Sequence, residues 1–276
     1  MPQISAADWL PGIPPTWLAW GMSQFVAFAL ATARLVGLFA VAPMFGHAEI
    51  RWTWRIALAA MLALLVTSAS FDSAAVATQP TIAELLGQVA VEAAVGVVLG
   101  LGVAAVFAGL QLAGQLIDQQ TGLALAEMLN PDLKATGSVT GHLLYLLGVT
   151  IFLALGGHVL AVTHLLDSFL AVPPGHAVVS ASLVGTLSSL VGQSFTLAIQ
   201  VAAPIVATLT LVTLLAGLAN RTLPQFGLFE WVFAGRVLLS WLLIGVVATQ
   251  LADGFPNVLG EVMERISLSP LGRGPG

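Results

Sequence analysis

The sequence predicts an all-α integral membrane protein built from about six long, partly broken hydrophobic helices. Of the 276 residues, 58% are hydrophobic and only 8% are charged, with a mean hydropathy of +0.98, whereas soluble domains carry roughly 25% charged residues. The apolar residues gather in long segments, and no hydrophilic linker divides the chain. We therefore expect a single helical domain over residues 1–276, with a short flexible N-terminal segment (1–16) and a flexible Pro/Gly-rich tail (269–276).

The expected helices follow one another with short connections. They cover residues 17–42, 54–70, 82–112, 138–170, 183–219 and 232–251. A membrane span needs about 20 apolar residues, and the second segment only just qualifies. The third, fourth and fifth segments would be roughly 46 to 56 Å long as continuous helices, against a hydrocarbon core of about 30 Å. They must tilt, break or leave the membrane, and we expect breaks at Gly156-Gly157 and at Ala202-Ala203-Pro204.

The few basic residues predict the orientation of the chain. Arg51, Lys134 and Arg221 lie in the connectors that follow the first, third and fifth segments, whereas connectors 71–81 and 171–182 hold no Lys or Arg. The positive-inside rule places the first three connectors in the cytoplasm and the N-terminus outside. The N-terminus lacks the positively charged region of a cleavable signal peptide, so we expect it to persist in the mature protein.

The residue types argue against an enzyme, a metal site or a cofactor site. The chain has no cysteine, no phosphate-binding loop and no G-x-S-x-G elbow. His158 and His164 are six residues apart, whereas the zincin pattern places its histidines four apart. No basic run exists that could hold nucleic acid.

Arg34 lies inside the first apolar segment. A charge at the centre of a membrane costs at least about 2.5 kcal/mol on insertion scales, so Arg34 needs a partner or water. Glu92 in the third segment is the nearest match by type and by position. The sequence leaves two interpretations open, namely a pathway or subunit contact and a buried structural ion pair.

A stripe of polar and then small residues follows the third segment at every fourth position. It consists of Glu84, Gln88, Glu92, Gly96, Gly100, Ala104 and Ala108. Residues four apart wind slowly around a helix, so the stripe presents one nearly continuous face. Small residues on such a face allow helix backbones to approach closely, and polar ones bond across the contact. We expect a helix-packing seam, with a place in a conduction path as the alternative.

Residues 114–137, GQLIDQQTGLALAEMLNPDLKATG, form the longest polar interruption of the chain. A stretch of this kind is typical of a catalytic loop, a plain connector, or backbone that lines a watery passage. Irregular backbone at membrane depth is tolerated only where protein or a water-filled cavity covers it. The residues alone leave these alternatives open.

This stretch and three other blocks resemble the FliR family of flagellar type III export-gate proteins, which is related to injectisome proteins. GQLIDQQTGLALAEMLNPDL and LLGVTIFLALGGHVLAVTHLLDSFLAVPPG are similar to the family pattern G-E-x-I-x-x-Q-x-G, Asp-Pro, F-L-A-x-x-G-H and S-F-x-x-x-P. ARLVGLFAVAPMFG (33–46) and APIVATLTLVTLLAGLANRTLPQF (203–226) agree as well. Gln115 and Asn130 depart from the pattern, which has Glu and Asp there.

The resemblance implies a non-enzymatic subunit of the flagellar export gate in the bacterial inner membrane, within the flagellar basal body. FliP-type and FliQ-type subunits, an FlhB-type component, unfolded flagellar proteins and membrane lipid are its implied partners. Residues 114–131 match a loop that plugs the channel, with site residues Gly114, Gln115, Leu116, Ile117, Asp118, Gln119, Gln120, Gly122, Leu123, Asn130 and Pro131. Arg221, Pro224 and Gln225 match a cytoplasmic partner loop. The alternative function is a secondary transporter with a site near Arg34 and Glu92.

Overall fold

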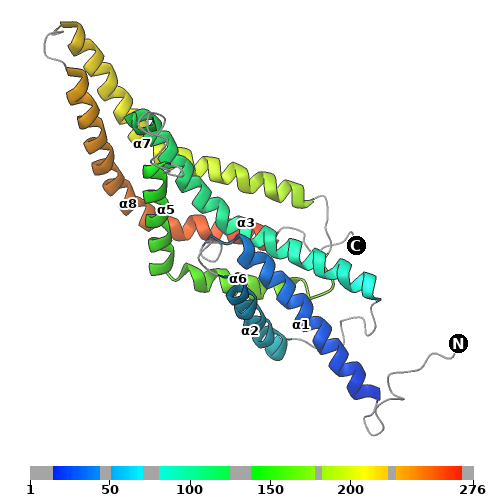
Figure 1. The fold of residues 1–276 in the computed structure, drawn as a ribbon. Helices are drawn as coiled ribbons and strands as arrows, with labels where there is room; N and C mark the ends of the chain where they lie inside the picture. The colour runs from blue at the N-terminus through cyan, green and yellow to red at the C-terminus, as the bar shows by residue number, and fades with distance from the viewer. Residues whose placement is uncertain are drawn as a thin grey trace. The chain divides into compact units, whose positions relative to one another are not determined.

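The computed structural model describes residues 15–43, 51–70, 81–124, 138–177, 182–222 and 228–268, and within these ranges the regular secondary structure is α-helical (Figure 1). The prediction of an all-α fold is thereby confirmed. The helices are α1 (Pro15–Val41), α2 (Trp52–Ser70), α3 (Ile82–Thr121), α5 (Val139–Ala154), α6 (Gly157–Ala171), α7 (Ser182–Thr222) and α8 (Leu228–Leu268).

The chain divides into two compact units. Unit 1 contains α1, α2, the first half of α3 and the C-terminal part of α6 with the turn that follows it. Unit 2 contains the second half of α3, α5 and most of α7 and α8. Helices α3, α6, α7 and α8 thus each contribute to both units.

In unit 1, α1 and the start of α3 run in the same direction and pack along their length. Val26, Ala27 and Leu30 of α1 form a buried cluster against Leu85 and Val89 of α3. Helix α2 connects the two and packs against α1. Where these aliphatic side chains would otherwise contact water, their burial is the main favourable free-energy contribution to the association of the helices.

In unit 2, the second half of α3 and α5 form an antiparallel pair. Phe107 of α3 makes edge-to-face contacts with Tyr145 and Phe152 of α5, at 5.7 Å between ring centroids in each case, which is within the favourable range for aromatic pairs. Helices α7 and α8 form a second antiparallel pair, in which Arg236 of α8 donates to Thr213 of α7.

The predicted break at Gly156-Gly157 is present. Helix α5 ends at Ala154, α6 begins at Gly157, and the two meet at a bend of 70°. Gly156 has φ = 70°, a left-handed conformation that glycine adopts without the steric cost that a side chain adds. The break therefore depends on Gly156, the same residue that predicts it in the sequence.

The predicted break at Pro204 is wrong. Helix α7 continues through this proline from Ser182 to Thr222, and Figure 1 shows it changing direction along its length. Proline removes one backbone donor and crowds the preceding turn, which bends a helix without necessarily ending it. One turn later, Thr208 donates its hydroxyl to the carbonyl of Pro204 at 2.7 Å.

The predicted end of the third helix is also wrong. Residues 114–121 do not form a loop, because α3 continues to Thr121. Leucine, isoleucine and glutamine are compatible with a helix, and Ile117 is completely buried. Packing of this turn in unit 2 outweighs the polar composition that suggested an interruption.

Among the described residues, four helices are long and apolar enough to cross a membrane, or up to five if the bent α5–α6 pair is one span. Helix α2 is shorter. The most apolar window of α3 is 61% buried inside the chain, whereas that of α8 is only 11% buried. The units therefore have well-packed interiors around α3 but leave α8 largely uncovered.

Candidate functional site

A buried ion pair joins α1 to α3 in unit 1. The Nε of Arg34 lies 2.7 Å from Oε2 of Glu92, and the two side chains are 0% and 1% exposed. This is the pairing that charge type and segment position suggested. The contact neutralises a charge that would be costly in an apolar environment.

Arg34 also holds the C-terminal end of α6. Its Nη1 donates to the carbonyl oxygen of Ser168 and its Nη2 to that of Val172, each at 3.1 Å. The Ser168 carbonyl also accepts the backbone N–H of Val172 at 3.0 Å. The last carbonyls of a helix carry partial negative charge, so a cation there is favourable. The guanidinium also lies over the Phe169 ring, 4.4 Å from its centroid.

Glu92 completes this arrangement on its other side. Its Oε1 accepts the backbone N–H of Gly175 at 2.8 Å, in the turn after α6. Gly175 has φ = 87°, which favours glycine. Sequence analysis missed Ser168, Val172 and Gly175 because they act through backbone groups that no side-chain pattern reveals. The pair is a clamp that fastens α6 and its turn to α1 and α3.

The predicted seam packs against α1 at its glycines. A Cβ at Gly96 would lie 1.9 Å from the carbonyl oxygen of Arg34, and one at Gly100 would lie 2.8 Å from that of Leu38. Only glycine permits so close an approach of the two backbones. The stripe from Glu92 to Gly100 is thus a contact within this chain.

The remaining members of the stripe lie elsewhere. Glu84 is exposed and accepts the backbone N–H of Thr81 at 2.8 Å, as in a capping box at the start of α3. Gln88 is partly buried, Ala104 is partly buried in unit 2, and Ala108 is exposed. The seam is therefore shorter than the sequence suggested.

The predicted plug residues up to Gln120 lie in α3, and the described plug residues divide into buried and exposed groups. Ile117 and Asp118 are buried, whereas Gln115 and Gln119 are exposed. Leu116, Gln120 and Leu123 are intermediate. Asn130 and Pro131 lie outside the described residues.

Gly114 is a packing glycine. A Cβ there would lie 2.2 Å from backbone atoms of Gly141 in α5, so the two helices touch through their backbones. Gly122, in contrast, has φ = 88° and follows the last residue of α3. Gly122 therefore has a backbone conformation that favours glycine, while Gly114 is fixed in the α3–α5 contact.

Asp118 connects the end of α3 to the start of α5. Its Oδ2 accepts the backbone N–H of Thr140 at 3.1 Å and the hydroxyl of Ser138, and its Oδ1 accepts the hydroxyl of Thr140. Ser138 is the N-cap of α5 and accepts the N–H of Gly141 at 2.7 Å. A carboxylate at a helix N-terminus is stabilised by the unpaired N–H groups and the helix dipole. The serine before an apolar run is a recognised start signal that could have revealed part of this site.

Helix α8 also contacts the end of α3. Arg236 Nη1 lies 3.4 Å from the carbonyl oxygen of Gln120, and a Cβ on Gly122 would lie 3.2 Å from the Phe233 ring. A cation beside a helix C-terminus is favourable. The last turn of α3 is therefore held by α5 on one side and by α8 on another.

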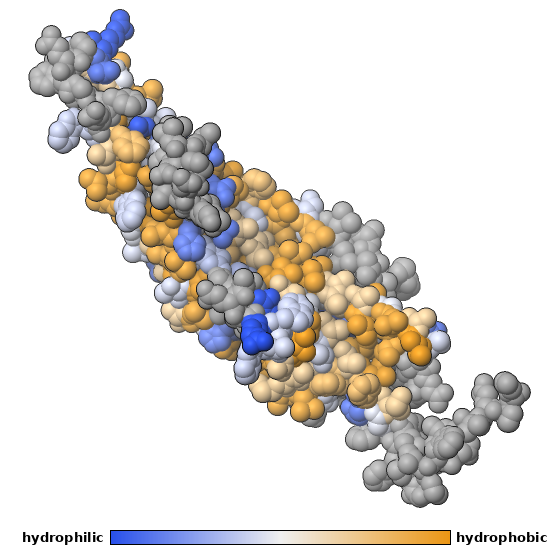
Figure 2. Space-filling model, in the orientation of Figure 1, coloured by the Kyte–Doolittle hydropathy of each residue, from blue (hydrophilic) through white to orange (hydrophobic). Residues whose placement is uncertain are grey.

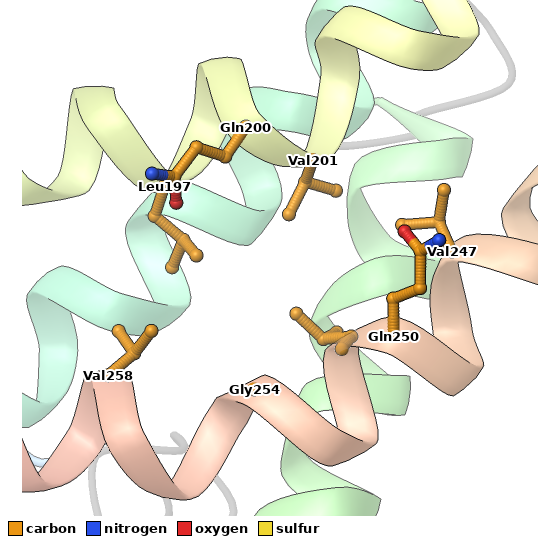
Figure 3. Close-up of a pocket in the computed structure, with 8 residues that line it drawn as sticks. Leu197, Gln200, Val201, Val247, Gln250, Gly254 and Val258 are labelled. Atoms are coloured by element: carbon orange, nitrogen blue, oxygen red, sulfur yellow. The ribbon is translucent and has the colours of Figure 1, made fainter.

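A pocket of about 150 Å³ lies between α7 and α8 in unit 2. Figure 3 shows Leu197, Gln200 and Val201 of α7 on one side and Gln250 of α8 on the other. The lining has two carboxamides and no titratable or nucleophilic side chain. In the described part of the chain, no three His, Asp or Glu side chains lie together as a metal would require. The pocket therefore offers no catalytic group.

The predicted cytoplasmic partner loop is only partly visible. Arg221 is exposed near the C-terminal end of α7. Pro224 and Gln225 lie outside the described residues.

Comparison with known families gives the decisive match. The model of bacterial export proteins, family 1, matches residues 25–262, which include all the contacts described above. The chain belongs to this family. The matched range starts within α1 and ends within α8, so both units of this export protein are part of the family fold.

Individual relatives agree with this assignment. The flagellar biosynthetic protein FliR of Bacillus subtilis is 27% identical over 243 residues, covering 87% of this chain and 93% of the relative. The proteins of that name from Pectobacterium carotovorum and Escherichia coli are each 26% identical, covering 91% of this chain and 96% and 94% of their own lengths. The export protein is thus a FliR-family component of the flagellar export apparatus, a structural family and not an enzyme family.

Proposed function

We propose that this export protein is one subunit of a channel that passes unfolded flagellar proteins across the bacterial inner membrane. FliP-type and FliQ-type subunits complete the channel, and an FlhB-type component docks on its cytoplasmic side, near Arg221. The chain supplies protein surface and a gate, and energy for transport comes from elsewhere.

The uncovered surface of the α7–α8 pair carries this proposal. Large apolar side chains on these helices are exposed, including Leu214 at 62% and Leu242 at 65%, and apolar residues dominate the face seen in Figure 2. The others on this surface are Leu211, Leu215, Leu218, Trp231, Leu238, Trp241 and Val246. Contiguous apolar surface of this kind marks contact with lipid or protein.

Helix length favours protein as the main cover. Helices α7 and α8 have 41 residues each, which corresponds to about 60 Å along each helix. The hydrocarbon core of a bilayer is only about 30 Å thick. The apolar span of α7, Gly185–Thr222, has 38 residues, and lipid tails cannot cover all of it. We infer that companion subunits cover the rest of this span.

The gate is assigned to the chain that follows α3. Residues 114–121 are packed in unit 2, so the proposed plug begins at Gly122 and includes Leu123, Asn130 and Pro131. The left-handed backbone of Gly122 supports a hinge there. The exposed Gln119 and the partly exposed Gln120 suit the wetted wall of a passage.

The transporter alternative receives no support from Arg34 and Glu92. A binding site for an ion or substrate needs charged groups with free hydrogen-bonding capacity. Here both side chains are buried and each is engaged by backbone groups as well as by its partner.

Mass measurement after gentle detergent extraction tests the assembly. A tagged chain of 28.5 kDa is expected to purify in a complex several times larger. Leu214→Glu and Leu242→Glu should each abolish copurification of the companions, because a charge would be buried in the interface. Leu86→Glu, at an exposed leucine of α3, is the matched control. A lone monomer or dimer in the wild type would contradict the proposal.

A further inference from the structure

We propose that the α7–α8 pair is a hinged hairpin, with Pro204 of α7 and Gly245 of α8 as the two residues of the hinge. The hinge joins the inner part of the hairpin to its outer part, residues 210–222 and 231–239, which we call the arm. The arm changes its angle when companion subunits bind its exposed apolar side chains. That last step rests on the proposed function, whereas the hinge itself is a property of this chain.

The contacts between the two helices place the hinge residues at the same level of the hairpin. Arg236 of α8 donates to the hydroxyl of Thr213 of α7, so these two residues lie opposite each other. Pro204 lies nine positions before Thr213, and Gly245 lies nine positions after Arg236. Because the helices are antiparallel and rise equally per residue, both counts lead to the same level. The two helices can therefore bend there together.

Both hinge residues weaken the helix in which they lie. Pro204 has no N–H, so the carbonyl of Gln200 loses its usual donor four residues later, and the proline ring crowds that turn. Helix α7 accordingly changes direction along its length (Figure 1). An added Cβ at Gly245 would meet nothing within 4 Å, so no close packing requires a glycine there. Its effect on α8 is a loss of helix stiffness.

Hydroxyl side chains weaken α7 on both sides of the proline. Each donates to the backbone carbonyl four residues earlier, an arrangement that slightly destabilises and often bends a helix. They are Ser194, Thr196, Thr208, Thr210 and Thr213. Helix α7 is therefore easy to bend over the whole stretch around Pro204.

Two pockets give α7 room to bend beside Pro204. One, of about 150 Å³, lies between α7 and α8, next to Leu197 and Val201. The other, of about 430 Å³, lies between α7 and the end of α3, next to Ala202 and Val206. At about 100° per residue, the two pairs of α7 residues lie on opposite faces of the helix. Close packing on either face would resist bending, and the pockets remove this resistance.

The arm has few contacts that could fix its angle. Buried residues continue along the hairpin as far as Leu209 in α7 and Ser240 in α8, both 0% exposed, and no residue of the arm is buried. The polar contact from Arg236 to the carbonyl oxygen of Gln120 at the end of α3 is long, at 3.4 Å. The angle of the arm is therefore set mainly by what binds to it.

A distance measurement along α7 tests the hinge. The chain has no cysteine, so spin labels can be placed on cysteines at Ser188 and Asn220, which are exposed near the two ends of α7. A straight helix would separate these positions by about 48 Å. In the full chain without companions, in detergent, we expect a broad distribution of distances with a mean below this value. In the assembled complex the distribution should be narrow.

Variants of the hinge residues should stiffen the chain without companions. Pro204→Ala should narrow the distribution and shift its mean towards the straight-helix distance, and adding Gly245→Ala should narrow it further. Gly235→Ala is the matched control, because an added Cβ meets nothing within 4 Å there either but the residue lies in the arm. If Pro204→Ala cannot be purified, Gly245→Ala alone carries the test. An unchanged distribution in the hinge variants would overturn the hinge.

Copurification tests whether the hinge is used in assembly. The double variant Pro204→Ala/Gly245→Ala should recover less of the companion subunits than Gly235→Ala does. Full recovery, or an equally narrow distribution with and without companions in the parent protein, would overturn the change of angle on assembly and leave the proposed function intact. A parent chain that purifies without companions would contradict the proposed function, while a broad distribution that Pro204→Ala narrows would still support the hinge.

Discussion

Arg34 and Glu92 lie 58 positions apart in the chain and meet through a 2.7 Å hydrogen bond from Nε to Oε2. The pair brings α1 and α3 together and also binds the end of α6 and its turn. Backbone groups form the remaining hydrogen bonds of both charged side chains. The pair therefore acts as a structural clamp.

Removal of one member of this pair should be more harmful than removal of both. Glu92→Gln and Arg34→Met should each lower the unfolding free energy by about 3–5 kcal/mol, because one buried charge loses its partner. The double variant Arg34→Met/Glu92→Met should be less destabilised than either single variant. Thermal unfolding of the purified protein in detergent measures the difference.

Arg51→Ala is the control for the loss of an arginine, since Arg51 is exposed. Single variants as stable as the parent protein would show that the pair is unimportant for stability.

Substitution of the glycines of α3 by alanine should change the free energy of unfolding by very different amounts. Gly96→Ala places a Cβ 1.9 Å from the Arg34 carbonyl oxygen, and because backbone cannot move aside locally we expect destabilisation of about 3 kcal/mol, the upper range for overpacking. Gly87, in the same helix, has nothing within 4 Å of its added Cβ. Gly87→Ala should stabilise by about 0.5–1 kcal/mol.

The same thermal unfolding assay compares the Gly96→Ala and Gly87→Ala variants. Equal stability of the Gly96 and Gly87 variants would remove the argument for a close α1–α3 contact.

A third variant, Gly100→Leu, should fail to copurify with companions, since crowding against Leu38 disrupts unit 1 itself.

Gly122 should tolerate asparagine better than alanine. Its φ of 88° costs a residue with a side chain about 1–2 kcal/mol, and asparagine enters this region more readily than alanine. We expect a larger resting leak from Gly122→Ala than from Gly122→Asn, because strain in this turn would shift the start of the proposed gate. Gly245→Ala, where an added Cβ meets nothing within 4 Å, is the reference, and a neutral Gly122→Ala would argue against a hinge.

The helices were predictable because hydrophobic segments carry a strong signal. Each of the six apolar segments corresponds to a helix or to the bent α5–α6 pair. The Gly156-Gly157 break followed from weak helix formers in sequence. Pro204 misled because neighbouring packing can preserve a bent helix through a proline.

The sites were less predictable than the helices. Arg34 and Glu92 could be matched because opposite charges inside apolar segments need each other. The backbone groups of Ser168, Val172 and Gly175 can bind this pair only because α6 ends at Ala171. No residue type in the sequence predicts these contacts. The polar composition around Asp118 predicts a loop, whereas the helix there depends on the burial of Ile117 beside it, which the residue types alone do not reveal.

The exposed apolar surface of α7 and α8 affects how much of this protein accumulates in the cell. A newly made copy without companions exposes the large apolar side chains of α7 and α8, and cells remove chains that persist in such incomplete states. We therefore expect the steady-state amount of this protein to depend on how quickly the chain enters its assembly, and overproduction of this chain alone to yield little additional protein.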